Sequence, residues 1–399
     1  MRDAPRSREP PYRALLSQPT VRWQALSGLL AQVTQGASGV GIILVVRQHT
    51  GSLALAGGVV GALSIAAGAA RPLQGRLIDS RGPAGVIAGT GVGHALALTA
   101  VVGLAGLPAP GVVLVLGGVA AGISLPPVST AMRVGWGERA ETDARTAAYS
   151  LVYLVQELAI LAGPLVLAAV IAVANPSAAV IVIAALTVVG AILFASSEAS
   201  HSGRHSAAAA RAGSALRSRG VQILVVIAML LGAVIGALEV AVPTVASAHR
   251  DPAASGLLIA ALAVGGITGA LAYGARRFES APTVRLVALL AWVTAVAFAL
   301  VGIESTLAEI GALLLICGLA LNPALTTISL LVDGHTPGRT AAEAFGWLST
   351  GIAGGTGAAS AIAGAVTQHG SSGRPAFLVA ALAAAAATTA AAAARRALG

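Results

Sequence analysis

The chain has 399 residues, of which 56% are hydrophobic and only 10% are charged. Soluble domains carry about 25% charged residues, so this composition excludes an ordinary soluble protein and indicates an integral membrane protein. The net charge is +9, but the arginines lie between apolar segments and not on one recognition face, so we expect no nucleic-acid partner. The single cysteine, Cys317, excludes an intrachain disulfide, and we find no metal-ligand spacing and expect no cofactor.

Residues 1–23 are polar and contain several arginines and prolines. A signal peptide would have a short apolar region followed by small residues at a cleavage site, and no such region follows this stretch. We therefore expect residues 1–23 to form a cytoplasmic tail that precedes an uncleaved first span.

Long apolar stretches fill the rest of the chain. About 20 apolar residues suffice to cross a bilayer as a helix, and twelve such stretches predict spans at residues 24–46, 53–73, 84–106, 111–132, 147–173, 178–196, 221–247, 255–275, 284–303, 308–332, 343–367 and 376–394. The longest hydrophilic interruption divides six spans from six. We therefore expect an all-α membrane protein with a six-helix bundle at 24–197, a cytoplasmic central loop at 198–220 and a second six-helix bundle at 221–399.

The arginines test this topology, because cytoplasmic loops of membrane proteins carry an excess of basic residues. With the amino terminus inside the cell, all but three of the 24 arginines fall in cytoplasmic tails, in cytoplasmic loops or at the span ends next to them. The exceptions are Arg47, Arg250 and Arg374. We therefore expect a multi-pass protein of the cell inner (plasma) membrane with both termini in the cytoplasm.

The two halves of the chain share a repeat. The segment Arg-Thr-Ala-Ala at residues 145–148 recurs at residues 339–342, and the same offset places Tyr153 on Trp347. Alanine-rich segments can resemble one another by chance, but separated matches at one offset favour a true repeat. Parallel repeats are typical of transporters that bind their substrate between two halves.

Residues 75–82, Gly-Arg-Leu-Ile-Asp-Ser-Arg-Gly, join the second predicted span to the third. This stretch resembles the loop motif Gly-x-Leu-x-Asp-Arg-x-Gly of the major facilitator superfamily. Ser80 stands where the motif has arginine, and Arg81 is displaced by one position. The resemblance implies two pseudo-symmetric six-helix bundles, transport by alternating access, and a monomer. The positions that match the motif are Gly75, Leu77, Asp79 and Gly82.

Gly163-Pro164 in the fifth span resembles the core of a motif found in drug and metabolite antiporters of the same superfamily, although its flanking residues differ. Residues 148–158 and 344–351 also resemble a subgroup of actinobacterial exporters. A proline inside a helix removes a backbone hydrogen bond and favours a bend. We therefore expect hinges at Gly163, Pro164, Pro243 and Pro323.

Residues 75–82 are a candidate conformational latch. Asp79 lies at the cytoplasmic end of a predicted helix. There it can pair with Arg133 or Arg139 after the fourth span, or with backbone amides at the start of a helix in the other half. Both alternatives stay open. The repeat places Tyr273 at the position equivalent to Asp79, so we expect the latch on one side only. The candidate latch residues are Gly75, Asp79, Arg81, Gly82, Arg133 and Arg139.

Glu157 is the first candidate for a proton carrier, because charges within spans are costly and mark functional sites. It lies 12 residues after Arg145, or about 18 Å along a helix, near the middle of the membrane. Tyr153 lies one turn earlier and can hydrogen-bond the carboxyl group. The alternative is that Glu157 is a fixed hydrogen-bond partner between helices.

Glu239 in the seventh span is the second candidate, because Pro243 leaves the backbone carbonyl of Glu239 without its helical donor. A carboxylate beside a broken helix makes a plausible gate. A solvated gate without proton transfer, or a structural ion pair with Arg47, is the alternative.

Uncharged polar and aromatic residues within the spans are candidates for substrate binding. Amides in spans also serve as plain hydrogen-bonding contacts between helices, and tryptophans also serve as packing residues. His94 in the third span can shuttle protons, with a buried, hydrogen-bonded histidine as the alternative. The substrate-cavity candidates are Gln32, Gln35, Tyr153, Gln156, Asn322 and Trp347.

The chain lacks lysine, so it has no Walker-type ATP-binding motif, and nothing in it suggests an enzyme or a catalytic residue. We predict a secondary active transporter, surrounded by the lipid bilayer, that exports a small apolar or amphipathic compound, a drug or metabolite, in exchange for protons. Uptake of a sugar or other nutrient by a facilitator or proton symporter is the main alternative. A membrane scaffold or receptor that does not transport is a third.

Overall fold

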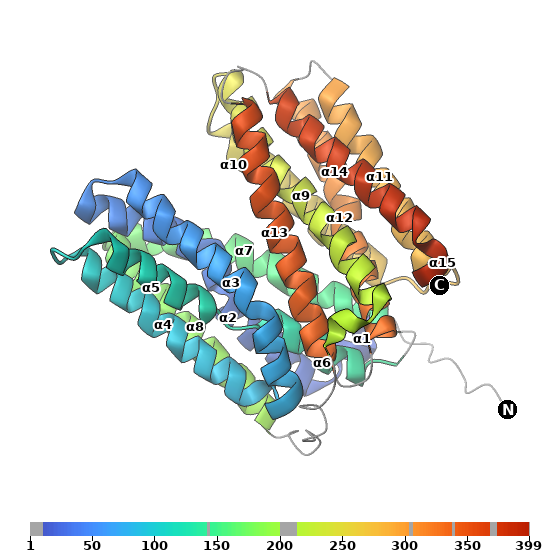
Figure 1. Ribbon diagram of the computed structural model, residues 1–399, viewed down its shortest axis with the longest axis horizontal. Helices are drawn as coiled ribbons and strands as arrows, with labels where there is room; N and C mark the ends of the chain where they lie inside the picture. Colours follow the sequence, from blue (N-terminus) through green and yellow to red (C-terminus); the bar gives the residue numbers. More distant parts are fainter. Residues whose placement is uncertain are drawn as a thin grey trace.

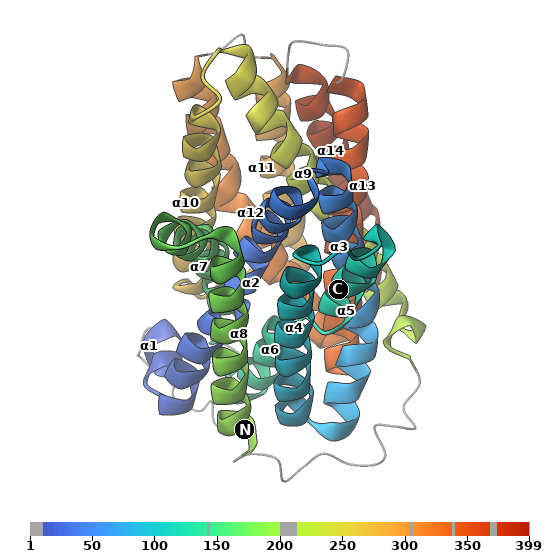
Figure 2. The same cartoon turned by 90° about the vertical axis from the view of Figure 1, so that its left-hand side faces the viewer.

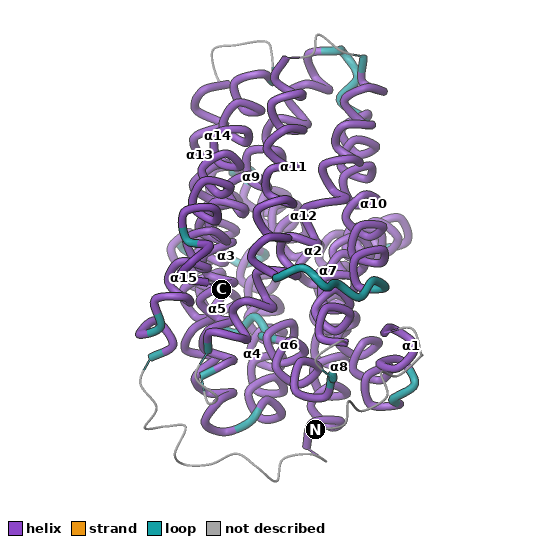
Figure 3. Tube along the Cα trace, turned by 90° about the vertical axis from the view of Figure 1, so that its right-hand side faces the viewer, coloured by secondary structure: helices purple, strands orange, loops and turns teal. Residues whose placement is uncertain are grey.

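The computed structural model describes residues 11–141, 144–199, 214–302, 306–336, 340–367 and 373–398. Within these ranges every regular element is a helix, as Figure 3 shows. Eleven stretches are long and apolar enough to cross a membrane. The remaining predicted span, the eleventh in chain order, is helix α13 (Ala341–Thr367), which is 27 residues long but contains many glycine, serine and threonine residues. The predicted all-α fold with twelve spans is confirmed.

Two groups of helices follow the two halves of the chain (Figure 1). The short helix α1 (Pro11–Leu16) precedes them. The first bundle contains α2 (Pro19–Thr50), α3 (Leu53–Arg81), α4 (Pro83–Ala105), α5 (Gly111–Ile123), α6 (Val128–Arg139), α7 (Arg145–Val173) and α8 (Pro176–Ala199). The second contains the short η3 (Ala215–Arg217) and then α9 (Arg219–Ala248), α10 (Ala254–Gly274), α11 (Pro282–Gly302), α12 (Leu307–His335), α13, α14 (Arg374–Ala393) and α15 (Arg395–Leu398).

Two local features depart from the simplest expectation. The fourth span is not one helix, because the chain leaves helical geometry between Ile123 and Val128, where Pro126 and Pro127 have no backbone N–H to donate. In the described part of the expected amino-terminal tail, residues 11–16 form a short helix, and the next helix begins at Pro19. Most of the expected central loop, residues 198–220, lies outside the described residues, so its limits stay a prediction.

The bundles converge at one end and diverge toward the other (Figure 1). At the convergent end α3 finishes at Arg81 and α13 starts at Ala341, and we call this the closed end. There α3 packs against α13, while α7 packs against α10 and α12. Figure 2, turned by 90°, places α1 and α6 at the same end.

Glycine allows α3 and α13 to cross with their backbones in contact. A Cβ atom at Gly75 would overlap the carbonyl oxygen of Ala342, and a Cβ at Gly346 would press on the carbonyl of Arg71. Immediately after α3, Gly82 has φ 84° and turns the chain into α4. The loop motif found in the sequence therefore lies where the two bundles touch.

Candidate functional site

Asp79 joins the two bundles through the start of α13. In the last turn of α3, its Oδ1 accepts a hydrogen bond from the backbone N–H of Ala342 at 3.0 Å, and its Oδ2 accepts one from Glu343 at 2.9 Å. The first amides of a helix lack partners within the helix and lie at the positive end of its dipole, so a carboxylate is well placed there. Of the two kinds of partner expected for Asp79, the structure shows the backbone amides.

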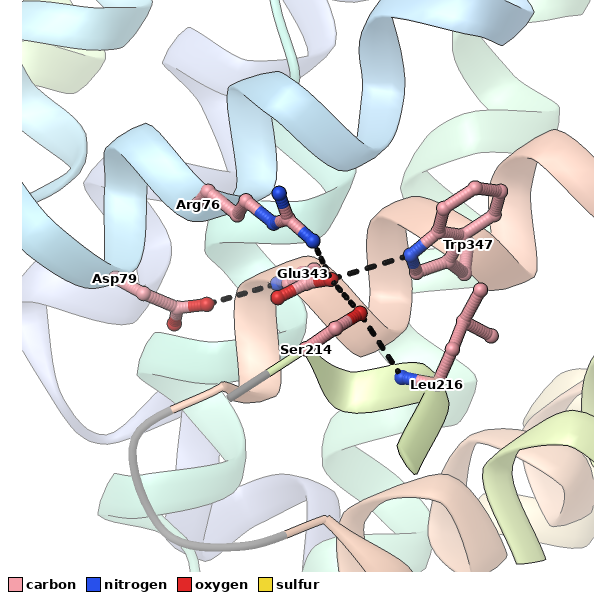
Figure 4. Close-up of polar contacts among 6 residues, drawn as sticks. All are labelled: Arg76, Asp79, Ser214, Leu216, Glu343 and Trp347. Carbon is pink, nitrogen blue, oxygen red and sulfur yellow. Dashed lines mark hydrogen bonds and ion pairs between the residues drawn. The ribbon is translucent and has the colours of Figure 1, made fainter. Parts of the chain in front are cut away.

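Glu343 is the centre of a second set of contacts beside Asp79 (Figure 4). Its Oε1 accepts hydrogen bonds from Arg76 Nη2 at 3.0 Å, from Ser214 Oγ at 2.7 Å and from Trp347 Nε1 at 3.3 Å. Ser214 precedes η3, so the Glu343 carboxylate also holds the start of the second bundle at the closed end. Glu343 was not among the site residues predicted from the sequence. The one sequence feature that points to it is its position directly after the repeated segment 339–342.

The α7 side of the closed end carries different contacts. Arg145 Nη1 and Asp333 Oδ2 form an ion pair at 2.8 Å between α7 and α12. On α1, the Tyr12 hydroxyl donates to the carbonyl oxygen of Ala270 in α10 at 2.7 Å. Burial raises the pKa of Tyr12 to about 12, so this hydroxyl stays protonated near neutral pH and can donate.

Glu157 contacts the other bundle near the middle of its helix. Its Oε1 accepts a hydrogen bond from Asn322 Nδ2 on α12 at 3.1 Å. Tyr153 does not bond the Glu157 carboxyl as expected, because its hydroxyl lies 3.0 Å from that of Ser329 on α12. Two of the predicted cavity residues therefore hold α7 to α12 in this state.

Arg133 is buried between the bundles, beside aromatic rings from both. Only 2% of it is exposed, and its guanidinium lies 4.8 Å from the ring centre of Tyr153 and 5.9 Å from that of Phe345. Its Nη2 donates to Gln156 Oε1 at 3.1 Å, whereas its Nε and Nη1 have no partner among the described residues. Of the other predicted latch arginines, Arg139 donates to the carbonyl oxygen of Gly135 in its own helix, and Arg81 is exposed.

The polar groups of α2 are satisfied within the first bundle. Gln32 donates to the carbonyl of Gly28 at 3.1 Å, and Gln35 donates to Gln32 at 3.2 Å. His94 is fully buried between the Thr34 hydroxyl and a carbonyl of α5. These contacts match the structural alternative for His94.

The remaining candidates lie on single helices. Glu239 is exposed on α9 and makes no ion pair with Arg47 among the described residues. The expected hinge residues Pro164, Pro243 and Pro323 lie inside continuous helices, and Gly163 lies against the backbone of α2. Within the described ranges, His, Cys, Asp and Glu form no group of three or more that could hold a metal ion.

Known proteins share this architecture. The sequence model described as Major Facilitator Superfamily matches residues 24–360. No curated protein matches the chain. A bacterial homologue of the iron transporter ferroportin, solved in an outward-facing state, is similar with a TM-score of 0.77 at 14% identity, covering 94% of this chain and 98% of that one.

Two further solved structures share the fold. The E. coli fucose:proton symporter FucP has a TM-score of 0.69 at 16% identity, with 94% of this chain and 97% of that one covered. The human organic anion transporter MFSD10 has a TM-score of 0.69 at 16% identity, with 96% and 100% covered. At these identities the likeness establishes the fold and leaves the substrate open.

Proposed function

The chain belongs to the Major Facilitator Superfamily, and we propose that it is a secondary active transporter that exports a small apolar or amphipathic compound in exchange for protons. In such transporters the substrate site lies between two halves that open alternately to the two sides of the membrane. The bundles here converge at one end and diverge at the other (Figure 1), which is the arrangement expected of one of those states.

The observation that carries the proton coupling is the hydrogen bond between Glu157 and Asn322, 3.1 Å long. The carboxyl group of Glu157 is on α7 of the first bundle, and the amide of Asn322 is on α12 of the second. An ionised acceptor makes the stronger hydrogen bond, so protonation of Glu157 weakens a contact that has to break when the bundles separate. Proton binding and opening of the closed end are thereby linked.

Export is favoured by the Gly163-Pro164 segment, which resembles the antiporter motif. A substrate with few charges is favoured by the low charge of the spans. We further propose that the closed end faces the cytoplasm of the cell inner membrane, with both termini on that side, because the arginines follow this topology. On this assignment the described state is closed toward the cytoplasm. We also propose that the protein acts as a monomer.

Proton flux in proteoliposomes tests the proposal. Liposomes with the purified protein enclose the pH-sensitive dye pyranine, and a panel of apolar and amphipathic compounds is added outside. Exchange makes the lumen more alkaline as compound enters and protons leave, whereas symport makes it more acidic. Protein-free liposomes correct for passive entry. A compound-driven acidification would refute exchange and favour the uptake alternative.

The variant Glu157→Gln identifies the carrier. We expect compound-driven proton flux to fall at least tenfold in this variant, because the amide cannot exchange a proton. Glu309→Gln is the matched control, because Glu309 and Thr306 form a capping box at the start of α12 and glutamine serves equally well at that position. Proton flux that persists in Glu157→Gln would show that Glu157 is not the carrier and would direct attention to Glu239.

A further inference from the structure

The short helix α1 lies at the closed end (Figure 2), and its side chains contact both bundles. Leu15 is only 1% exposed and packs into an apolar cluster of the first bundle that includes Val21 and Met132. One turn earlier, Tyr12 donates its hydroxyl to the carbonyl oxygen of Ala270 in the second bundle at 2.7 Å. The segment is therefore anchored in one bundle and hydrogen-bonded to the other.

Tyr12 occupies a space that glycine leaves in the wall of α10. A Cβ atom at Gly274 would overlap the Tyr12 hydroxyl and would lie 2.8 Å from the Cβ of Ser150 on α7. The hydroxyl thus enters the crossing of α7 and α10, where no larger residue than glycine fits beside it. This fit depends on the bundles being together, because Ser150 and Gly274 belong to different bundles.

The crossing that Tyr12 contacts is related by the repeat to the crossing that Asp79 fastens. Asp79 fastens α3 to α13, and the repeat-related crossing is that of α10 with α7. The residue equivalent to Asp79 there is Tyr273, whose hydroxyl lies 2.8 Å from Thr327 within the second bundle. That crossing therefore lacks the Asp79 type of latch, and Tyr12 reaches it from outside the repeat.

We propose that the amino-terminal segment is a conformational strap, in which α1 moves with the first bundle and Tyr12 fastens the α7–α10 crossing whenever the closed end is shut. The strap sets the fraction of molecules in which this end is closed. Its release is one step in the opening of this end. It depends on alternating access, but on neither the direction of transport nor proton coupling. Its test is accordingly independent of the proton-flux experiment.

A disulfide across the bundles measures closure without a substrate. A Cβ at Gly68 would lie 3.8 Å from the Cβ of Ala353, which is the mean separation in disulfides. We would introduce Gly68→Cys and Ala353→Cys after replacing the buried Cys317 by alanine. The rate of disulfide formation with copper phenanthroline, in the full-length protein, then reports how often α3 and α13 are packed together as in the closed state.

Three variants on this background test the strap. Tyr12→Ala removes the ring and the hydroxyl, and we expect cross-linking to slow about tenfold. Gly274→Ala displaces Tyr12 from the opposite side without altering α1, and its Cβ also presses on Ser150 of α7, so a slowing at least as large is expected. Ser17→Ala is the control, because the Ser17 hydroxyl donates only to Ala14 in the same segment, and it should cross-link at the rate of the unaltered background.

Each outcome of these measurements either supports the strap or overturns it. Slower cross-linking in both Tyr12→Ala and Gly274→Ala, with melting temperatures in detergent near that of the background, supports the strap. Unchanged rates in both variants would overturn it. Slower cross-linking confined to Tyr12→Ala, together with a large fall in melting temperature, would make Tyr12 a structural residue of the first bundle and would also overturn the proposal.

Discussion

Asp79→Asn is the sharpest test of how the closed end is held. The carboxylate accepts two hydrogen bonds from the first amides of α13, at 3.0 and 2.9 Å. Asparagine keeps one acceptor oxygen, turns an N–H donor toward the other amide, and loses the charge that favours the helix start. Hydrogen bonds to charged groups contribute about 1.5–3 kcal/mol each.

Allowing for the bond that asparagine retains, we expect the closed state to lose about 2–3 kcal/mol, which lowers the ratio of closed to open protein roughly 30- to 150-fold. The steps of the cycle that require closure slow accordingly, while the affinity for substrate changes little because Asp79 lies at the end of α3. Cross-linking of Gly68→Cys with Ala353→Cys measures the population, and turnover in proteoliposomes measures the switching rate.

Ser80→Ala is the matched control for Asp79→Asn. The Ser80 hydroxyl donates only to carbonyls of its own helix, those of Arg76 and Leu77, so its loss leaves the contacts between bundles intact. If Asp79→Asn abolished substrate binding and left cross-linking unchanged, Asp79 would belong to the binding site and the latch would be wrong.

Two further substitutions test the packing of the same end. Gly75→Ala places a Cβ on the carbonyl oxygen of Ala342, so we expect cross-linking at least tenfold slower. Gly61→Ala, whose Cβ meets nothing within 4 Å, should leave it unchanged, and equal rates in the two variants would refute the close crossing. Arg133→Met removes a buried guanidinium with two unpaired nitrogens, an arrangement that costs about 1–3 kcal/mol. We therefore expect a higher melting temperature in detergent, and a lower one would show that the charge is compensated.

The sequence was sufficient for the architecture because span length and the placement of arginine depend on the membrane. Apolar stretches of about 20 residues have few folded alternatives. Asp79 was recognisable for a similar reason, since a carboxylate at a helix end beside glycines has few uses within an apolar chain. The choice between an arginine and a helix start as its partner needed the structure, because both lie within reach of the same helix end.

Other contacts had no signal in the sequence. Glu343 gathers partners from α3 and from the segment before η3, and Tyr12 reaches α10 across more than half the chain. Such pairs depend on how two bundles pack, which spacing along the chain does not encode. Helix periodicity predicts that Tyr153 and Glu157 share a face of α7, yet the Tyr153 hydroxyl bonds that of Ser329 on α12 instead.

The closed end is thus held by unlike contacts on its two sides, although the halves are related by a repeat. On the α3–α13 side, the Asp79 carboxylate binds backbone amides at the helix crossing, beside an ion pair between Arg76 and Glu343. On the other side, the ion pair of Arg145 with Asp333 is partly solvated, with 40% and 24% of the two side chains exposed, and such pairs contribute about 1 kcal/mol or less and weaken with salt. The buried hydroxyl of Tyr12 adds a contact there that salt does not screen. Because the two sides respond to different perturbations, loosening one leaves the other in place, and a single substitution shifts the population of the closed state without abolishing it.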